Sequence, residues 1–136
     1  MPESIELIIP SNPKYMRLLR KLIEDSAELM GFNEIDSENI SLAVDEACTN
    51  IIRHSYDNDF NQKIIINLYS DEKKMQVYLK DFGKRLNPSE IKIKNKRKLK
   101  PGGLGIGLIV KIMDIVEYNK TLEYNIVKLT KFLKSK

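Results

Sequence analysis

The order in which the hydrophobic pattern changes its period constrains the fold of this chain more than any other feature. A weakly alternating segment comes first, two long segments with apolar residues at helical spacing follow, and short β-branched segments separated by turns complete the chain. The predicted elements are a strand over 4–9, helices over about 13–30 and 36–57, a hairpin over 63–80, a helix over about 104–113, and two strands over 115–132. This order predicts an α/β (α+β) two-layer sandwich, with the helices on one face of a mixed, mostly antiparallel sheet.

Polar residues and glycine mark where several of these elements begin and end. The Asn-Pro step at residues 12–13 is typical of a helix start, and Gly31 is typical of a helix end. Asp36 or Ser37 can cap the second helix. We expect the last two strands to turn around residues 119–120.

The bulk properties exclude several classes of protein. The 136 residues fit a single domain over 1–136, which is long enough to bury a core without a disulfide or a metal. Cys48 is the only cysteine, and its place in the apolar stripe of the second helix predicts a buried small hydrophobe. No apolar run approaches the ~20 residues that span a bilayer, and the first residues lack the layout of a signal peptide. We therefore expect a cytoplasmic protein that does not contact a membrane.

The net charge of +4 comes largely from two basic segments. Six of the nine residues over 92–100 are Lys or Arg, and a second basic group lies at the C-terminal end. Such a run is either a solvated loop or a mobile segment close to phosphates. Because no aromatic residue interrupts it, base stacking is not indicated, and we expect no direct contact with nucleic acid.

Glu46, Asn50 and His54 are spaced four residues apart at the edge of the apolar stripe of the second helix. An Asn carbonyl is a hard oxygen ligand that suits Mg²⁺. A Glu one turn away can deprotonate an attacking hydroxyl. A solvated helix flank is the alternative for this pair. For His54, the apolar arc favours a partly buried, hydrogen-bonded histidine over a catalytic one.

Asp81 and Gly83 follow the second strand of the hairpin. A carboxylate at a strand end can accept a hydrogen bond from the exocyclic amine of adenine, and it would reject the keto group of guanine. A glycine two residues later lets a base approach the backbone. A plain turn, in which Asp and Gly are both favoured, is the alternative.

Four glycines lie within residues 102–107, where the third helix is predicted to begin. A glycine-rich helix start leaves backbone N–H groups available for phosphate. The segment lacks the Gly-Lys-Ser/Thr of a Walker loop, and no plausible core strand precedes it as a Rossmann fingerprint requires. A phosphate-binding loop is therefore favoured over a flexible turn.

These three motifs, in this order, resemble those of the gyrase/histidine-kinase/MutL (GHKL) ATPase superfamily, and most of all the bacterial anti-sigma factor serine/threonine kinases. Residues 42–54 resemble the N-box of that family, residues 80–83 its first glycine box, and residues 100–108 its second. The similarity runs from about residue 5 to 133. The resemblance implies a Bergerat-type ATP-binding fold, ATP and Mg²⁺ as cofactors, and protein serine/threonine kinase activity.

The resemblance also implies a role for each matching position. Glu46 would be the catalytic base, Asn50 would hold Mg²⁺ against the phosphates, and Asp81 would recognise the adenine amine. Residues from about 89 to 101 would form a lid over the phosphates, and Arg20 would contact the partner protein. The pocket would be shaped by Gly83, Gly103, Leu104, Gly105 and Gly107.

The implied partners are an anti-sigma factor antagonist of the STAS type, which is phosphorylated on serine, and a sigma factor, which a homodimer of the kinase sequesters. Three departures from the family pattern are present: Lys84 and Arg85 follow Gly83 where a second glycine is common, Glu123 and Tyr124 replace a late Gly-Thr, and the lid is unusually basic. The missing glycine and the basic lid favour an alternative, a non-catalytic, nucleotide-gated binding module. A weaker alternative is the ATP domain of a histidine kinase, for which no phosphoacceptor helix pair is seen ahead of the first strand.

Overall fold

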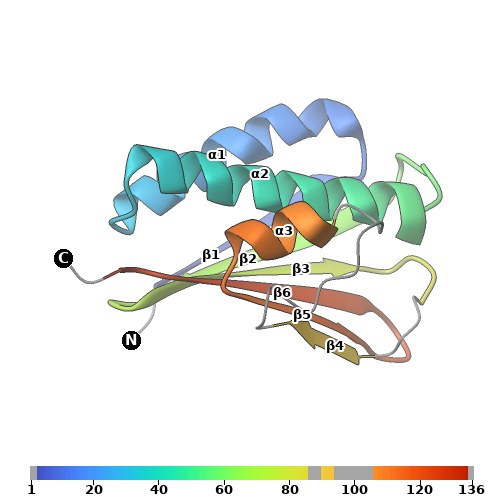
Figure 1. Ribbon diagram of the computed structural model, residues 1–136. Coiled ribbons are helices and arrows are strands. Elements are labelled where there is room, and N and C mark those ends of the chain that lie inside the picture. Colours follow the sequence, from blue (N-terminus) through green and yellow to red (C-terminus); the bar gives the residue numbers. More distant parts are fainter. Residues whose placement is uncertain (1–2, 86–89, 94–105, 135–136) are drawn as a thin grey trace.

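The structure, a computed structural model, describes residues 3–85, 90–93 and 106–134 (Figure 1). The side chains of residues 90–93 are not described. In chain order the elements are β1 (Glu3–Pro10), a 3₁₀ turn (Pro13–Tyr15), α1 (Met16–Leu29), α2 (Glu34–Asn50), a π-helical turn (Ile51–Ser55), β2 (Lys63–Ser70), β3 (Lys74–Asp81), β4 (Glu90–Ile93), α3 (Ile106–Ile112), β5 (Ile115–Lys120) and β6 (Asn125–Phe132).

The elements form two layers, and all three helices lie on the same face of the sheet (Figure 1). The sheet has six strands in the order β1-β2-β3-β6-β5-β4. The predicted sandwich is confirmed, but the sheet is not mixed, because every pairing of these strands is antiparallel. Among the described residues, no helix has both the length and the apolar content that crossing a bilayer requires.

The core lies between the helices and the sheet. Along β2 and β3 every second side chain is buried, as the period of two requires for a sheet covered on one face. The helices contribute residues at four-residue spacing, such as Leu19, Ile23 and Ala27 of α1. Cys48 is fully buried in this core, as predicted, and burial raises the pKa of its thiol.

Polar residues and a glycine mark the boundaries of the helical segments. The Asn12 side chain caps the 3₁₀ turn that leads into α1 by accepting a hydrogen bond from the Lys14 N–H at 3.0 Å, and Gly31 follows α1 with φ of 107°. The predicted cap of α2 was wrong. The helix begins earlier, and Asn33 caps it by accepting a hydrogen bond from the Asp36 N–H at 2.7 Å.

The predicted lid over 89–101 contains a strand. Residues Glu90–Ile93 form β4, which pairs with β5 so that Ile91 lies opposite Tyr118. The alternation of apolar and basic residues that begins at Ile91 is the pattern of an edge strand. Residues 94–105 lie outside the described part of the chain, and so does the rest of the predicted lid.

The turn between the last two strands lies later than predicted. β5 continues to Lys120, which pairs with Asn125. The turn is formed around Thr121, whose side-chain oxygen accepts hydrogen bonds from the N–H groups of Glu123 and Tyr124, both at 3.1 Å. Two backbone N–H groups are thus bonded to this side chain instead of to a neighbouring strand, so the chain reverses direction there.

Candidate functional site

A pocket opens between the C-terminal end of α2, the start of α3 and the strands β3, β5 and β6. It holds about 550 Å³ of empty space, a volume that includes its open mouth. Its polar lining comprises Asn50, His54, Ser55, Asp81, Tyr118, Asn119, Lys120 and Asn125, and its apolar lining comprises Ala47, Ile51, Ile106, Ile126 and Val127.

The helical wall of the pocket is one face of α2 and of the π-helical turn that continues it. Ala47, Asn50, Ile51, His54 and Ser55 follow the spacing i, i+3, i+4, i+7 and i+8. At 3.6 residues per turn, a residue four positions before Asn50 lies about 40° further around the helix, away from this face. The residue there is Glu46, the predicted base, and it is not part of the pocket lining.

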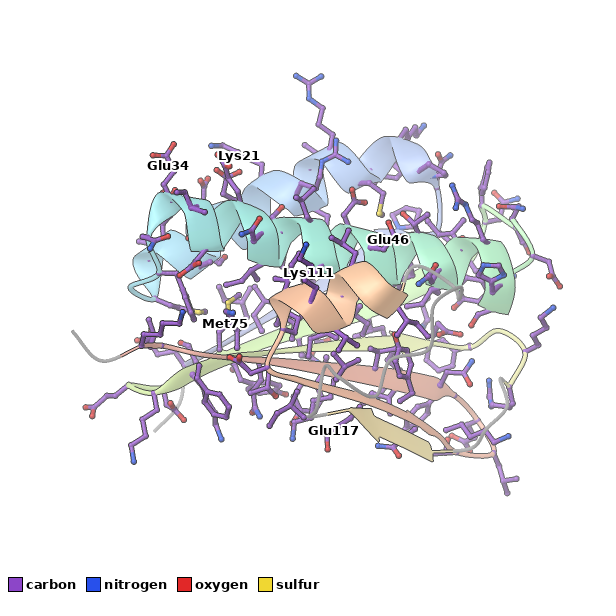
Figure 2. All side chains as sticks on the ribbon, in the orientation of Figure 1. Lys21, Glu34, Glu46, Met75, Lys111 and Glu117 are labelled. Carbon is purple, nitrogen blue, oxygen red and sulfur yellow. The ribbon has the colours of Figure 1, made fainter. Side chains whose placement is uncertain are left out.

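That residue, Glu46, is half-buried on α2. Figure 2 shows Glu46 toward the C-terminal end of α2, on the side where α3 begins. Its position suits a group that acts beside the pocket mouth, where the end of a bound ligand would be reached by a second molecule.

The helix that supplies this wall widens in its last turn. The Tyr56 N–H donates to the Ile51 carbonyl, five residues earlier, at 3.0 Å. Asp57 and Asn58 then adopt positive φ values of 49° and 62°, which end the helix. A single π turn is frequent at functional sites. Here it places Ser55 against the end of β3.

Asp81 is the last residue of β3 and is only 1% exposed. Its Oδ1 accepts hydrogen bonds from the Gly83 N–H and from Asn125 Nδ2, both at 3.0 Å. Both of these hydrogen bonds end on Oδ1. Burial raises the pKa of Asp81, and the hydrogen bonds from Asn125 and Gly83, together with the nearby Ser55 hydroxyl, partly oppose that rise. The hydrogen bonds from Asn125 and Gly83 therefore use one carboxylate oxygen and leave the other to the pocket.

Gly83 holds the end of β3 against the end of α2. A Cβ atom at this position would lie 2.3 Å from the Ser55 carbonyl oxygen and 2.8 Å from the Ser55 Cβ. The next residue, Lys84, donates its N–H to the same carbonyl at 2.9 Å. Only glycine permits this approach, so Gly83 shapes the pocket by fixing Ser55 beside Asp81.

The two residues after Gly83, which depart from the family pattern, have structural partners. Lys84 forms an exposed ion pair with Asp57 at 3.0 Å. The Arg85 guanidinium donates to the carbonyl oxygens of Gly83, Thr121 and Leu122. Arg85 thus connects the loop after β3 to the turn between β5 and β6, next to the strand ends that line the pocket.

Two buried hydroxyl groups at the pocket have no hydrogen-bond partner in the described part of the chain. They are Ser55 Oγ and the Tyr118 hydroxyl. Burial raises the pKa of Tyr118 to about 12, so its hydroxyl stays protonated and remains a donor. Buried polar groups are almost always paired, so two unpaired hydroxyls in one pocket indicate that a polar ligand belongs there.

The structure brings together only some of the predicted site residues. Asn50 and Asp81 both line the pocket, and Glu46 does not. Gly107 is exposed near the start of α3, where its neighbour Ile106 lines the pocket. The predicted residues Gly103, Leu104 and Gly105 lie outside the described residues.

Arg20, predicted to contact a partner, lies on α1 away from the pocket lining. Its Nη1 is 2.9 Å from Asp45 Oδ2, in a partly exposed ion pair. Asp45 directly precedes Glu46, so α1 is joined to α2 next to the predicted base.

Sequence reasoning missed Ser55, Tyr118 and Asn125. The helical spacing from Ala47 to Ser55 and the alternation along β6 carry the signal for two of them. It was not recognised because serine and asparagine near turns are usually interpreted as turn formers.

The pocket residues suit a metal ion only if most of its ligands come from water and a bound nucleotide. Among the described residues, no group of three or more His, Cys, Asp or Glu side chains could hold a metal ion. Mg²⁺ needs few protein ligands when water and phosphate oxygens complete its shell. Asn50, with its side-chain amide at the pocket, therefore fits an ion that arrives with a nucleotide.

The comparison with known families identifies the fold as that of an ATPase domain. The histidine kinase-like ATPase domain family matches residues 9–131. The chain belongs to this family. Within it, the chain is similar to two bacterial enzymes named serine-protein kinase RsbW. The enzyme of Halalkalibacterium halodurans is 31% identical over 140 residues, which cover 97% of this chain and 85% of the relative. The enzyme of Bacillus mycoides is 35% identical over 124 residues, which cover 85% and 76%.

A solved structure shows the same fold. The crystal structure of the RsbU and RsbW domains of a Mycobacterium tuberculosis protein matches with a TM-score of 0.69 over 98% of this chain and 33% of that chain, at 12% identity. Together, these findings confirm the predicted family, the anti-sigma factor serine/threonine kinases, and with it the fold class and the enzyme class. The chain is a serine-protein kinase with an ATP-binding domain, and the non-catalytic alternative is not favoured.

Proposed function

We propose that the chain binds Mg²⁺ and ATP in the pocket between α2 and the sheet and transfers the γ-phosphoryl group to a serine of an anti-sigma factor antagonist of the STAS type. The observation that carries this proposal is Asp81, a buried carboxylate at the pocket whose hydrogen bonds from Gly83 and Asn125 both end on Oδ1. Its other oxygen, Oδ2, is costly to bury unless a ligand donates to it.

The base of the nucleotide is the group that fits this oxygen. The exocyclic amine of adenine donates a hydrogen bond, whereas guanine would present a carbonyl oxygen to the carboxylate. The apolar lining, including Ala47, Ile51 and Val127, suits the faces of a planar ring. We therefore assign the base to the part of the pocket bounded by Asp81.

The phosphates would extend toward the start of α3. Asn50 would hold Mg²⁺ through its amide oxygen, and the ion would neutralise charge on the phosphates when bound. Gly103, Leu104, Gly105 and Gly107 would supply the backbone donors of a phosphate-binding loop, as the family resemblance implies. Glu46, one helical turn before Asn50 on α2, would meet an incoming serine hydroxyl at the terminal phosphate.

The chemical step assigned to Glu46 is proton removal. The serine oxygen forms a new bond to the γ-phosphorus, the bond between that phosphorus and the leaving ADP oxygen breaks, and the serine proton passes to the Glu46 carboxylate. Arg20 would contact the partner protein. Its ion pair with Asp45, the residue directly before Glu46, holds it close to this base. We further propose that the kinase acts as a homodimer in the cytoplasm and that its second partner is a sigma factor.

Two variants separate the proposed roles of the base and the metal ligand. Asn50→Ala should weaken Mg·ATP binding itself, because it removes the amide oxygen. Glu46→Gln should leave binding nearly unchanged and lower phosphoryl transfer by about 10²-fold, the lower end of general-base effects, since phosphoryl transfer depends largely on positioning and charge. The measurements are ATP affinity by calorimetry and single-turnover phosphorylation of the antagonist, with phosphoserine identified by mass spectrometry.

Glu38→Gln is the matched control, since it removes an exposed carboxylate from the same helix and should alter neither quantity. Unchanged turnover in Glu46→Gln would refute the base assignment. If the wild type binds ATP but transfers no phosphate to its true partner, the chain would be a nucleotide-gated binding module instead of a kinase.

A further inference from the structure

Ser55 carries a buried hydroxyl group that the fold does not use. The residue is 4% exposed, it lines the pocket, and its Oγ has no hydrogen-bond partner among the described residues. Nearby serines on the same helix are different. Ser41 has the same exposure, but its Oγ donates to the Arg20 carbonyl at 2.8 Å. A serine hydroxyl in a helix can usually find a carbonyl acceptor, so the unpaired state of Ser55 requires an explanation.

The position of Ser55 is fixed by the structure around it. The π-helical turn directs the residue toward β3, and the close approach of Gly83 and the Lys84 N–H to the Ser55 carbonyl holds its backbone in place. The hydroxyl lies beside the Asp81 carboxyl and lowers the pKa of that group, although the two groups do not meet at hydrogen-bond geometry. The pocket wall thus presents an acceptor, Asp81 Oδ2, next to a donor, Ser55 Oγ–H.

An acceptor beside a donor is the complement of one edge of adenine, on which the 6-amino group donates and the adjacent ring nitrogen N1 accepts. We propose that Ser55 donates a hydrogen bond to N1 of adenine while Asp81 accepts one from the 6-amino group, so that the two residues together determine the choice of base. This inference rests on the proposed function, since it places ATP in this pocket. Guanine has the opposite arrangement, with an acceptor at position 6 and a donor at N1.

A cycle of residue and ligand changes tests the pairing directly. The ligands are ATP and 1-deaza-ATP, in which a C–H group replaces N1. The proteins are the wild type, Ser55→Ala and the control Ser41→Ala. The wild type should bind 1-deaza-ATP about three- to tenfold more weakly than ATP, the effect of one lost hydrogen bond. Ser55→Ala should bind ATP more weakly by a similar factor and should bind the two ligands equally.

The control and the fold itself supply the remaining readouts. Ser41→Ala should keep the preference for ATP over 1-deaza-ATP, since its hydroxyl bonds to Arg20 and does not line the pocket. In thermal unfolding without nucleotide, Ser55→Ala should be at least as stable as the wild type, because it removes an unpaired buried polar group. Lower affinity in Ser55→Ala therefore cannot be attributed to a damaged fold.

The outcomes distinguish this inference from the proposed function. If Ser55→Ala still prefers ATP over 1-deaza-ATP as strongly as the wild type does, the pairing with N1 is wrong while ATP binding stands. If the wild type binds no ATP, both the inference and the proposed function are wrong.

Discussion

At the scale of single residues, the two oxygens of Asp81 have separate tasks. Oδ1 joins β3 to β6 and to the loop after β3, through Asn125 and Gly83. Oδ2 is the group that we assign to the ligand. This division explains why a carboxylate is kept at a buried position, although its charge is costly there.

The variant Asp81→Asn separates the two tasks. Its amide oxygen can still accept from Gly83 and Asn125, but an NH₂ group replaces Oδ2 and would face the amine of adenine. We expect ATP affinity to fall about tenfold or more, the effect of a missing hydrogen bond at a buried site, while the fold is retained. Calorimetric titration with ATP and GTP measures this. Equal affinities of the wild type for the two nucleotides would remove Asp81 from base recognition.

The same variant also tests how the free energy of unfolding depends on pH. Burial raises the pKa of Asp81 above its ordinary value of 3.8, so the native state holds this proton more tightly than the unfolded chain does. The contribution of this group to the free energy of unfolding therefore falls as the pH rises from 3.8 to the raised pKa, and it is constant above that. Asp81→Asn lacks this titration. Urea unfolding at a series of pH values should show the variant gaining stability relative to the wild type across that interval, and a constant difference at all pH values would contradict the assignment.

At the scale of elements, the pocket depends on how the end of α2 meets the end of β3. The π-helical turn brings Ser55 to the strand, and Gly83 allows the contact between the two backbones. Arg85 then connects the loop to the turn between β5 and β6. Three elements distant in sequence are thereby held around one small volume.

A pair of glycine substitutions tests this contact. Gly83→Ala would place a Cβ atom 2.3 Å from a backbone oxygen, so we expect it to lower the free energy of unfolding by about 1–3 kcal/mol. Gly107→Ala would meet no atom of the described residues within 4 Å and lies in a helix, so it should be neutral or stabilising by up to about 1 kcal/mol. Urea unfolding of the two variants provides the comparison. Equal effects would mean that the loop after β3 can shift away from Ser55 at little cost in stability.

Hydrophobic periodicity was sufficient to predict the two long helices, the hairpin and the two-layer arrangement, because each has a buried face with a clear repeat. It did not predict the cap at Asn33, since Asp36 and Ser37 are equally good caps and only the backbone decides between them. It did not predict β4, because the charge of the basic run obscured a short alternation. Asp81 and Asn50 were predicted from their chemistry together with the family resemblance, and both line the pocket. Ser55 was not predicted, because its role depends on a helical turn of unusual period.

At the scale of the whole molecule, the sheet is covered by helices on one face only (Figure 1). Its two hairpins, β2–β3 and β5–β6, are each formed by neighbouring segments of the chain. The other central pairing, β3 with β6, joins distant segments and lies in the middle of the sheet. The polar end of the pocket belongs to this pairing, where Asp81 lies opposite Asn125.

The pairing of β3 with β6 has a consequence for the kinetics of folding. Asp81 and Asn125 are 44 residues apart, so their contact requires the closure of a long loop, whereas each hairpin forms locally. If this closure follows the rate-limiting step, ATP cannot speed refolding, and all of its stabilisation must appear as slower unfolding. In stopped-flow experiments, ATP at one hundred times its Kd should leave the refolding rate unchanged and slow unfolding about 100-fold. A refolding rate that rises with ATP would show instead that β3 and β6 meet early, and that the nucleotide assists the assembly of its own site.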